Sequence, residues 1–458
     1  MVFTLAVLEF GLLSVGFCGA VLLWGRPLPL DWTSLAIYVS QAFTLVLCCV
    51  ISFYYNDLYD IRRIRSFDQF SPRFIQSVGV VFILLAVLYS FFPQLRLADG
   101  PFYSSLLVLI ILVIPVRAIL YAIMRSPALR ERVLILGGGA LAGKLASEIQ
   151  GATYLRYSVV GFVDGTDDHA MLAQGSSATV RRTILGPLEN LGEIIDDVRP
   201  GRVIVAMTER RRRLPVMDLL DLRLHGTLVE DGVEVYEDIT GKLAIETLTP
   251  SCLLFSRDFE KSRYQRGLRR AISLAASLIG LIALAPLWGI IALLIRLDSK
   301  GPVLFIQERV GAGGRIFRLV KFRTMHPRPG DETEPVWERD VDSRVTRVGK
   351  WLRKLRLDEL PQFLNILKGD MDLVGPRPEM ACNVKAMGEK IPYYSLRHMV
   401  RPGITGWAQV KHGYSVHQED VAEKVRYDLY YIKHMSLWFD LRILVDTVKI
   451  VLFGRGAR

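Results

Sequence analysis

The chain contains little cysteine. Only five cysteines occur among 458 residues, and no two of them form a C-x-x-C pair. Structural zinc sites and redox motifs depend on that spacing, and a disulfide framework needs a denser set in a shorter chain. The sequence therefore indicates neither a zinc site nor a disulfide scaffold, and it fits a reducing compartment. The cysteines are Cys18, Cys48, Cys49, Cys252 and Cys382.

Acidic residues are also in deficit. The chain has 46 Asp and Glu against 57 Lys and Arg, which gives a net charge of +11. A basic balance of this size predicts an anionic partner, either membrane lipid or a phosphorylated substrate. Because 51% of the residues are apolar and gather in long runs, we expect the chain to lie in a membrane and to bind no nucleic acid.

Charged residues are scarce in four stretches of the first 125 residues. Each stretch provides the ~20 apolar residues that a helix needs to cross a bilayer. The first has neither a basic leading region nor a small-residue cleavage site, so we expect it to be a retained helix and not a signal peptide. Residues 1–125 therefore predict four transmembrane helices. The stretches cover roughly residues 2–24, 33–55, 72–92 and 102–124.

Positive charge is distributed unevenly between the loops. The loops around Arg26–Asp31 and Arg96–Asp99 carry little of it, whereas the loop after the second stretch and the end of the fourth are rich in arginine. The positive-inside rule then places the N-terminus and everything after residue 125 in the cytoplasm. The arginines concerned are Arg62, Arg63, Arg65, Arg125, Arg130 and Arg132.

Residues 131–255 predict a Rossmann-like α/β domain. Apolar strands at 132–139, 157–165 and 201–207 alternate with helical segments such as 140–150, a pattern typical of a parallel sheet. The loop Gly137-x-Gly139-x-x-Ala142, with Asp164 after the second strand, is a loose dinucleotide fingerprint. A scaffold that binds no dinucleotide gives the same pattern. The Arg210–Arg213 run reads as a solvated or lipid-facing patch, with a phosphate site as the alternative.

A fifth long apolar segment lies at 271–295, inside a predicted helix at 268–296. Basic residues stand on both of its flanks, so the positive-inside rule wants both ends in the cytoplasm. Pro286 falls in its middle, where it removes a helical hydrogen bond and forces a kink. We expect a re-entrant, broken helix, and an ordinary fifth crossing remains the alternative.

Beyond residue 300 the sequence is amphipathic and basic. Residues 344–355 place apolar side chains near one face of a predicted helix, with arginine and lysine around the rest, and residues 421–453 are rich in Tyr, Trp and Lys. Both patterns are typical of helices that lie in an anionic membrane interface. A helix facing a protein core would show a similar stripe.

Residues 353–379 contain an adjacent pair of carboxylates, Asp358 and Glu359, at an apparent helix start with Pro361 in the first turn. Arginine and lysine flank the pair on both sides. Neighbouring carboxylates in a basic surround suit a divalent metal and a phosphorylated substrate. The simpler interpretation is an N-cap Asp followed by a first-turn Glu.

Three long motifs decide between these interpretations. They are GPVLFIQERVGAGGRIFRLVKFRTM (301–325), LRLDELPQFLNILKGDMDLVGPRPE (355–379) and VRPGITGWAQV (400–410). In this order they resemble the bacterial sugar transferases, the polyprenyl-phosphate hexose-1-phosphate transferases. The resemblance covers residues 264–458, and the whole chain is similar to the long form that initiates exopolysaccharide assembly. The family often has Ser-Pro at its membrane-helix break, whereas this chain has Ala285-Pro286.

The resemblance implies a multi-domain membrane protein whose C-terminal domain is monotopic and mostly α-helical, in the bacterial inner membrane with its catalytic face toward the cytoplasm. It implies transfer of a hexose-1-phosphate from a UDP-sugar to polyprenyl (undecaprenyl) phosphate through a phosphosugar-aspartyl intermediate. Asp358 is then the nucleophile, Glu359 its acidic neighbour, and Mg²⁺ the cofactor bound by both. A homodimer is compatible with the extra domains, and the sugar is not readable from the sequence.

Further motif residues receive roles from the same resemblance. The expected phosphate contacts are Lys321, Arg323, Arg353 and Arg377. Arg401 is expected on the nucleotide side, with Thr405 and Gln409 as weaker candidates. A lipid headgroup contact is the alternative for each basic residue, and Asp370 and Asp372 are either metal ligands or parts of a turn.

An enzyme of another class stays as the competing hypothesis. A membrane-attached, NAD-dependent enzyme that modifies sugar nucleotides would use the Gly137 loop as its cofactor site. Such an enzyme predicts a Tyr-x-x-x-Lys pair downstream of that loop, and none occurs between residues 140 and 260.

Overall fold

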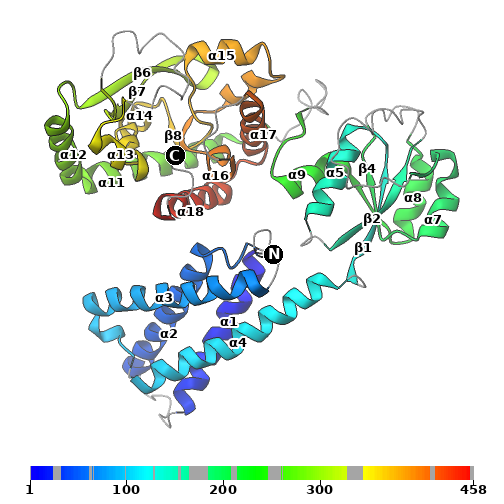
Figure 1. Cartoon of the computed structure of the whole chain (residues 1–458), viewed down its shortest axis with the longest axis horizontal. Helices are drawn as coiled ribbons and strands as arrows, with labels where there is room; N and C mark the ends of the chain where they lie inside the picture. The colour runs from blue at the N-terminus through cyan, green and yellow to red at the C-terminus, as the bar shows by residue number, and fades with distance from the viewer. Residues whose placement is uncertain are drawn as a thin grey trace. The chain divides into compact units, whose positions relative to one another are not determined.

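The computed structural model divides the chain into two compact units, 1–232 and 233–458, which are taken separately below (Figure 1). It describes most of the chain. The expected arginines Arg62, Arg63, Arg65 and Arg210–Arg213 lie outside the described residues. Those residues are 2–23, 32–60, 64, 67–97, 99–126, 129–152, 156–164, 184–207, 214–245, 259, 261–326, 344–412 and 418–453.

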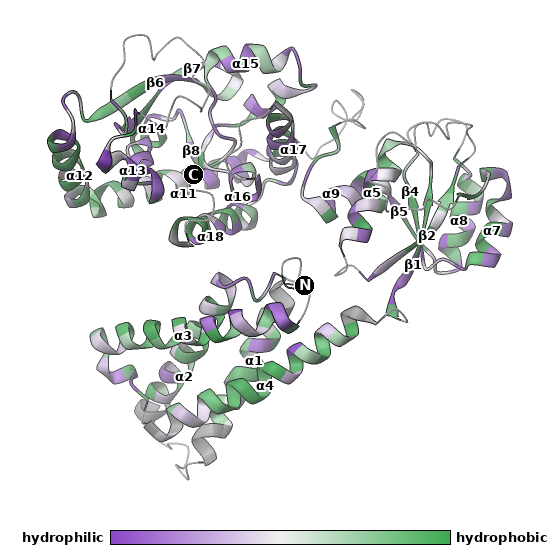
Figure 2. Cartoon of the chain, in the orientation of Figure 1, coloured by the Kyte–Doolittle hydropathy of each residue, from purple (hydrophilic) through white to green (hydrophobic). Residues whose placement is uncertain are grey.

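Four helices form the first part of unit one: α1 (Val2–Leu23), α2 (Trp32–Tyr55), α3 (Phe67–Phe91) and α4 (Asp99–Arg125). Three contain stretches long and apolar enough to cross a membrane, namely Ala36–Tyr55, Phe67–Phe91 and Phe102–Ile123, and α1 holds a shorter apolar stretch, Leu8–Gly19. Figure 2 shows hydrophobic colour along these helices. Because large apolar side chains such as Ile83 and Ile111 face outward, the arrangement suits a lipid surround.

A pair of buried charges links the helices of this bundle. Arg117 of α4 donates through Nε to Glu9 Oε1 of α1 at 2.7 Å and through Nη1 to the Leu58 carbonyl at 2.8 Å. Both charged side chains are at most 1% exposed. The close approach of α1 and α4 also needs Gly16, where a Cβ would lie 2.6 Å from Val108. The two buried charges therefore compensate each other within a tightly packed helix interface.

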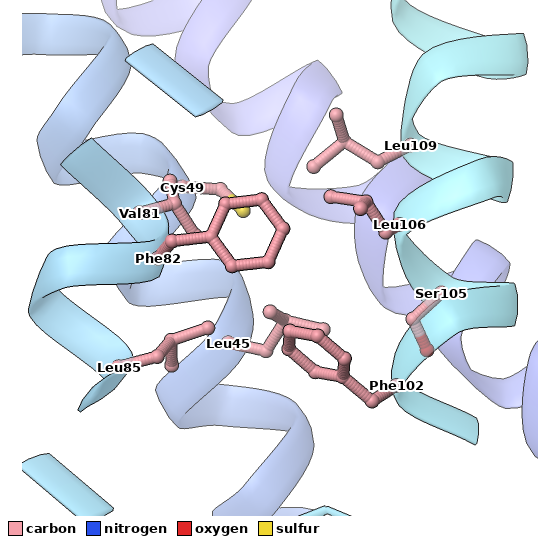
Figure 3. Close-up of a pocket in the computed structure, with 9 residues that line it drawn as sticks. All are labelled: Leu45, Cys49, Val81, Phe82, Leu85, Phe102, Ser105, Leu106 and Leu109. Carbon is pink, nitrogen blue, oxygen red and sulfur yellow. The ribbon is translucent and has the colours of Figure 1, made fainter. Parts of the chain in front are cut away.

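Figure 3 shows a small cavity between α2, α3 and α4. Leu45 and Cys49 come from α2, Val81, Phe82 and Leu85 from α3, and the rest from α4. None of the nine lining residues is charged, and only Ser105 and Cys49 carry a polar atom on the side chain. The cavity therefore offers no chemistry of its own.

The second part of unit one is an α/β domain with five parallel strands in the order β3-β2-β1-β4-β5. The parallel sheet confirms the predicted α/β domain. The sequence missed two short strands, β3 and β5, because three or four residues carry little periodicity. The strands are β1 (Glu131–Leu136), β2 (Tyr157–Val163), β3 (Ile184–Gly186), β4 (Arg202–Val205) and β5 (Leu228–Asp231); the helices are α5 (Ala140–Gly151), α7 (Leu191–Val198) and α8 (Val216–Leu224).

The glycine loop lies where expected, between β1 and α5. Gly137 has a φ of +113°, and a Cβ there would press on the backbone of Ala206 and Met207. A Cβ on Gly138 would lie 2.1 Å from Asp164 Oδ2, so the carboxylate after β2 sits directly against the loop. The glycines thus have a structural reason that requires no ligand.

Unit two begins before the expected catalytic domain. Helix α9 (Gly232–Thr240) leads into Leu243 and Ile245, which are buried in one cluster with Trp407, Val425 and other residues of the C-terminal half. The Trp407 indole N–H donates to the Gly241 carbonyl at 2.9 Å. Residues 241–245, placed by the sequence in the α/β domain, therefore pack into the core of unit two.

The rest of unit two is mostly helical, with a β-hairpin and one short parallel strand pair. The hairpin is β6 (Leu304–Val310) with β7 (Ile316–Phe322), and the pair is β8 (Asp372–Val374) with β9 (Gly403–Thr405). The helices are α11 (Arg263–Ala283), α12 (Ala285–Asp298), α13 (Arg347–Lys354), α14 (Gln362–Lys368), α15 (Ala381–Gly388), α16 (Trp407–His412), α17 (Gln418–His434) and α18 (Leu437–Phe453).

The apolar segment with the central proline forms two helices. Helices α11 and α12 are bent by 63° at Leu284, and Pro286 stands at the start of α12, where its missing N–H costs no helical bond. The kink was predicted from Pro286. Exposed apolar side chains such as Ile282 and Leu293 line the bent pair.

Candidate active site

The Asp358-Glu359 pair lies in a tight turn between two helices. Helix α13 ends at Lys354, Arg356 takes a left-handed conformation with φ 54°, and residues 357–359 form a 3₁₀ turn. Helix α14 begins only at Gln362, with Pro361 at its N-cap. The expectation that the pair starts a helix is corrected here, because the left-handed Arg356 separates the turn from α13 and the α-helix starts three residues later.

Apolar packing holds this turn in place. Leu357 and Leu360, on either side of the carboxylates, pack against a cluster that contains Ile291 and Ile295 of α12 and Phe322 of β7. Asp298 Oδ2, at the end of α12, accepts a hydrogen bond from the Val348 N–H in the first turn of α13. The bent helix pair thus supports the segment that carries the carboxylates.

Asn365, which the sequence analysis overlooked, ties α14 to β7. Its side chain is fully buried. Its Oδ1 accepts from the Val320 N–H at 3.0 Å, and its Nδ2 donates to the Arg318 carbonyl at 2.7 Å. The two bonds set the turn before α14 beside β7, which carries Lys321. A buried amide in a short apolar helix was the available signal.

Glu359 is neutralised by two cations. It is 6% exposed, and its Oε1 lies 3.5 Å from Lys321 Nζ and 3.1 Å from Arg377 Nη1. Burial by itself would raise the pKa of Glu359, but Lys321 and Arg377 outweigh that effect and lower the pKa to about 2. Glu359 is therefore a permanent anion, and two expected phosphate contacts converge on it.

Asp358 has a different environment although it is the next residue. Within the described part of the chain, no hydrogen bond or ion pair engages its carboxylate. Burial and the neighbouring Glu359 charge raise its pKa, and Lys321, Arg377 and Arg353 only partly compensate. Environments that push the pKa values of two carboxyls apart are typical of sites where the two have separate roles. Asp358 is the more basic carboxylate, and it is unpaired.

Burial and the neighbouring charges have opposing effects on the pKa of Lys321. Burial lowers its pKa, Glu359 and Asp358 raise it, and Arg377 lowers it again. It comes from β7, whereas Arg377 comes from the loop after β8, where Pro376 and Pro378 restrict the backbone. Folding therefore brings residues 38 and 18 positions from Glu359 to the same carboxylate oxygen.

Arg323 has another task. Its Nη1 donates to the Lys300 carbonyl and its Nη2 to the carbonyl and hydroxyl of Ser299. Gly301, with φ +124°, leaves the room that this guanidinium occupies. Arg323 therefore clamps the turn after α12, and its expected role as a phosphate contact stays a prediction. Arg353 is exposed at the end of α13 and makes a long contact with Met325 Sδ at 3.7 Å.

The three predicted residues of the third motif lie around β8 and β9. Arg401 is 43% exposed and faces Asp372 at 3.9 Å. The Thr405 hydroxyl is buried and shares a 2.7 Å hydrogen bond with Thr447 of α18. Gln409 donates to the Ile404 carbonyl at 3.2 Å and has a buried Oε1 without a hydrogen bond. No contact joins these three to Glu359 in the described residues, so their roles stay predictions.

Asp372 belongs to a structural ion pair. Arg270 of α11 donates to Asp372 Oδ1 at 2.9 Å and to the Met371 carbonyl at 2.7 Å, and it also reaches the Ile366 carbonyl at the end of α14. Asp370 accepts a long hydrogen bond from Asn365 at 3.4 Å. Both contacts favour the turn interpretation for these aspartates over metal ligation.

The carboxylate pair suits Mg²⁺ only where a substrate phosphate supplies further ligands. Mg²⁺ commonly binds through one or two carboxylates, with phosphate oxygens and water completing the shell. Asp358 and Glu359 supply adjacent carboxylates, but Glu359 Oε1 is already engaged by two cations. No group of three His, Cys, Asp or Glu side chains able to hold a metal occurs among the described residues. The donor set therefore fits Mg²⁺ shared with a substrate phosphate.

Two family models match parts of this chain. A model described as bacterial sugar transferase matches residues 264–454, and one described as CoA-binding domain matches residues 54–213. Neither they nor the relatives below are named as NAD-dependent enzymes, and the competing hypothesis has no support here.

Three relatives are similar over long stretches. An Aeromonas hydrophila UDP-N-acetylgalactosamine-undecaprenyl-phosphate N-acetylgalactosaminephosphotransferase is 45% identical, over 49% of this chain and 52% of its own length. For a Komagataeibacter xylinus undecaprenyl-phosphate glucose phosphotransferase the figures are 37%, 72% and 60%. For an Escherichia coli K12 UDP-glucose:undecaprenyl-phosphate glucose-1-phosphate transferase they are 32%, 71% and 68%. The chain thus spans 52–68% of the length of these relatives, and it belongs to the bacterial sugar transferase family.

Proposed function

We propose that the chain transfers a sugar-1-phosphate from a UDP-sugar to undecaprenyl phosphate, as the initiating step of exopolysaccharide synthesis. One observation carries this proposal. Asp358 is an unpaired carboxylate of raised pKa, next to a Glu359 that two cations hold ionised. A more basic carboxylate is a better nucleophile, and a neighbour that already occupies the nearest cations leaves it free to attack.

The reaction balances in two displacements at one phosphorus. A carboxylate oxygen of Asp358 bonds to the sugar-bearing phosphorus of the UDP-sugar, the bond from that phosphorus to the bridging oxygen breaks, and UMP leaves with the electron pair. An oxygen of undecaprenyl phosphate then attacks the same phosphorus and releases the Asp358 carboxylate. The product is an undecaprenyl diphosphate sugar. Two steps let one site treat two anionic substrates in turn.

Positively charged side chains would surround the transferred phosphoryl group. Arg353 and Arg377 lie on different segments around the turn, and both lower the pKa of Asp358, which places their charges within electrostatic reach of the nucleophile. Fixed cations stabilise negative charge that develops on phosphate oxygens. Mg²⁺, bound by Asp358 and shared with the diphosphate, would offset the repulsion between the carboxylate and its anionic substrate.

We also propose the membrane arrangement that such a reaction needs. The four N-terminal helices would cross the bacterial inner membrane. The bent pair α11 and α12 would enter and leave its cytoplasmic leaflet, so that Asp358 stays on the side where UDP-sugars are available. Exposed apolar side chains on unit two, such as Trp351, Trp438 and Leu293, supply the surface for that leaflet.

The test is release of UMP by the purified full-length protein with Mg²⁺ and undecaprenyl phosphate. The donors are UDP-glucose, UDP-galactose and UDP-N-acetylgalactosamine, since relatives are named for glucose and N-acetylgalactosamine. Asp358→Asn should lower the rate by at least about a thousandfold, as expected for loss of a nucleophile. Glu389→Gln, an exposed carboxylate after α15, is the matched control and should keep the wild-type rate.

Either of two results would contradict the proposal. UMP release that persists in Asp358→Asn would remove the covalent step. A folded wild-type protein that releases no UMP from these three donors or from a wider panel of UDP-sugars would remove the donor class.

A further inference from the structure

Arg397 is a buried cation with several hydrogen-bond partners, one of them in the loop that carries Arg377. It lies in a 3₁₀ helix, Tyr394–Met399, and is 4% exposed. Its Nη1 donates to the Tyr394 hydroxyl at 2.9 Å, and its Nη2 donates to Asp428 Oδ2 at 2.7 Å. Asp428, on α17, is 2% exposed. The sequence analysis gave neither residue a role.

The same guanidinium also holds the backbone of the proline-flanked loop. Arg397 Nη2 donates to the Arg377 carbonyl at 3.1 Å, and Glu379 of the same loop lies 3.9 Å from Arg397 Nη1. Arg377 in turn donates to Glu359. A continuous set of polar contacts therefore runs from Asp428 through Arg397 and Arg377 to the carboxylate beside Asp358.

We propose that Arg397, held by Asp428, is a positioning residue for the transfer: it fixes the Arg377 loop so that the Arg377 guanidinium meets Glu359 and leaves Asp358 unpaired. The inference rests on the proposed function. It differs from a purely structural role, because Arg397 acts on the rate through Arg377 and makes no contact with substrate.

Shape explains why an arginine is needed at this position. The planar guanidinium reaches an acceptor on each of three segments, namely the Tyr394 hydroxyl, the Asp428 carboxylate and the Arg377 carbonyl. A lysine ammonium carries the same charge on a single nitrogen. It cannot reach three separated acceptors as the planar guanidinium does. Arg397→Lys therefore keeps the charge and removes the geometry.

The experiment is a double-mutant cycle in the full-length protein, with kcat/KM for UMP release as the readout. We expect Arg377→Lys to lower kcat/KM about a hundredfold, because it loses a guanidinium close to the reacting phosphate. Arg397→Lys should lower it about tenfold. If Arg397 acts through Arg377, the double variant should be no slower than Arg377→Lys alone, since residues in one network are not additive.

Two further variants keep the test decisive. Asp428→Asn, similar in shape, should reproduce the loss of Arg397→Lys and the same non-additivity, and it replaces that variant if Arg397→Lys does not fold. Glu423→Gln removes the ion pairs of Glu423 with Lys242 and Arg426, also involving α17, without touching the Arg377 loop. It should leave kcat/KM unchanged, alone or beside Arg377→Lys.

The outcomes separate this inference from the function beneath it. An active wild type with wild-type kinetics in Arg397→Lys and Asp428→Asn overturns the inference alone. Losses that simply multiply in the double variant also overturn it, because they mark a general effect on stability. A wild type that releases no UMP overturns the proposed function first, and the inference with it.

Discussion

Two clusters of buried charge in this protein use the same residue types to opposite effect. In the N-terminal bundle, Glu9 and Arg117 pair at 2.7 Å with at most 1% of either side chain exposed. In the C-terminal unit, Glu359 pairs with Lys321 and Arg377, and the adjacent, partly exposed Asp358 has no hydrogen bond or ion pair in the part of the chain that the structure describes. In the first cluster the single carboxylate is paired with an arginine, whereas in the second one of two carboxylates has no ion pair among the described residues.

The difference teaches that buried charge by itself does not mark a reactive site. Among the N-terminal helices, one glutamate faces one arginine, and the two buried charges compensate each other. In the C-terminal unit, the nearby cations pair with Glu359, and burial together with the Glu359 charge raises the pKa of Asp358. Reactivity follows from this unequal pairing.

The strongest way to break this comparison is to neutralise the paired carboxylate. Glu359→Gln leaves Lys321 and Arg377 free to close on Asp358, which would tie up the nucleophile and lower its pKa. We expect kcat/KM for UMP release to fall about a hundredfold, comparable to losing one strong electrostatic contact in an active site. Steady-state kinetics of the purified variant measure this. A rate within a few-fold of wild type would mean that Glu359 does not hold the cations away from Asp358.

A smaller effect should appear in the pH dependence. Only the ionised Asp358 can attack, so kcat/KM should fall as the pH drops through the raised pKa of Asp358, while Glu359, with a pKa of about 2, stays ionised throughout. Lys321→Met removes a cation that lowers the Asp358 pKa, so this acid limb should move to higher pH. Profiles of kcat/KM for both proteins test the direction. A limb that stays in place or moves to lower pH would contradict the assignment.

The smallest effect on transfer is expected from the bundle. Glu9→Gln leaves Arg117 buried without its counterion, which should cost about 3 kcal/mol of stability, in the range for breaking a buried pair. The rate per folded molecule should stay within about twofold, since such a pair has no role in transition-state binding. Thermal unfolding in detergent and UMP release measure the two. Asp68→Asn, an exposed carboxylate at the start of α3, is the control, and a large rate loss in Glu9→Gln would erase the contrast.

The sequence predicted much of the fold because many of its signals are local. Apolar stretches such as 102–124 form helices, because a helix satisfies the backbone hydrogen bonds within a long apolar run. The strand before Gly137 and the helix after it followed from period and glycine placement. The three-residue strand β3 was missed because pairing with β2 supplies what its own sequence lacks.

The candidate site was predictable in its members but not in their roles. Arg323 looked like a phosphate contact beside Lys321, yet it clamps the turn at Ser299 and Lys300. Arg401 looked like a nucleotide contact, and its nearest charge is Asp372. Lys321 lies on β7 and Arg323 directly follows it. Both are basic and only two positions apart, so only their packing environment distinguishes them.

By itself the sequence determined the long apolar helices, the parallel sheet and the presence of a carboxylate pair among cations, because these depend on composition and on spacing along a few turns of chain. Tertiary structure alone decided which cation serves which carboxylate. Lys321 reaches Glu359 across 38 residues and Arg270 reaches Asp372 across 102. Coulomb energy depends on distance in space and on burial. The difference between a paired Glu359 and an Asp358 without an ion pair among the described residues therefore exists only once the chain has folded.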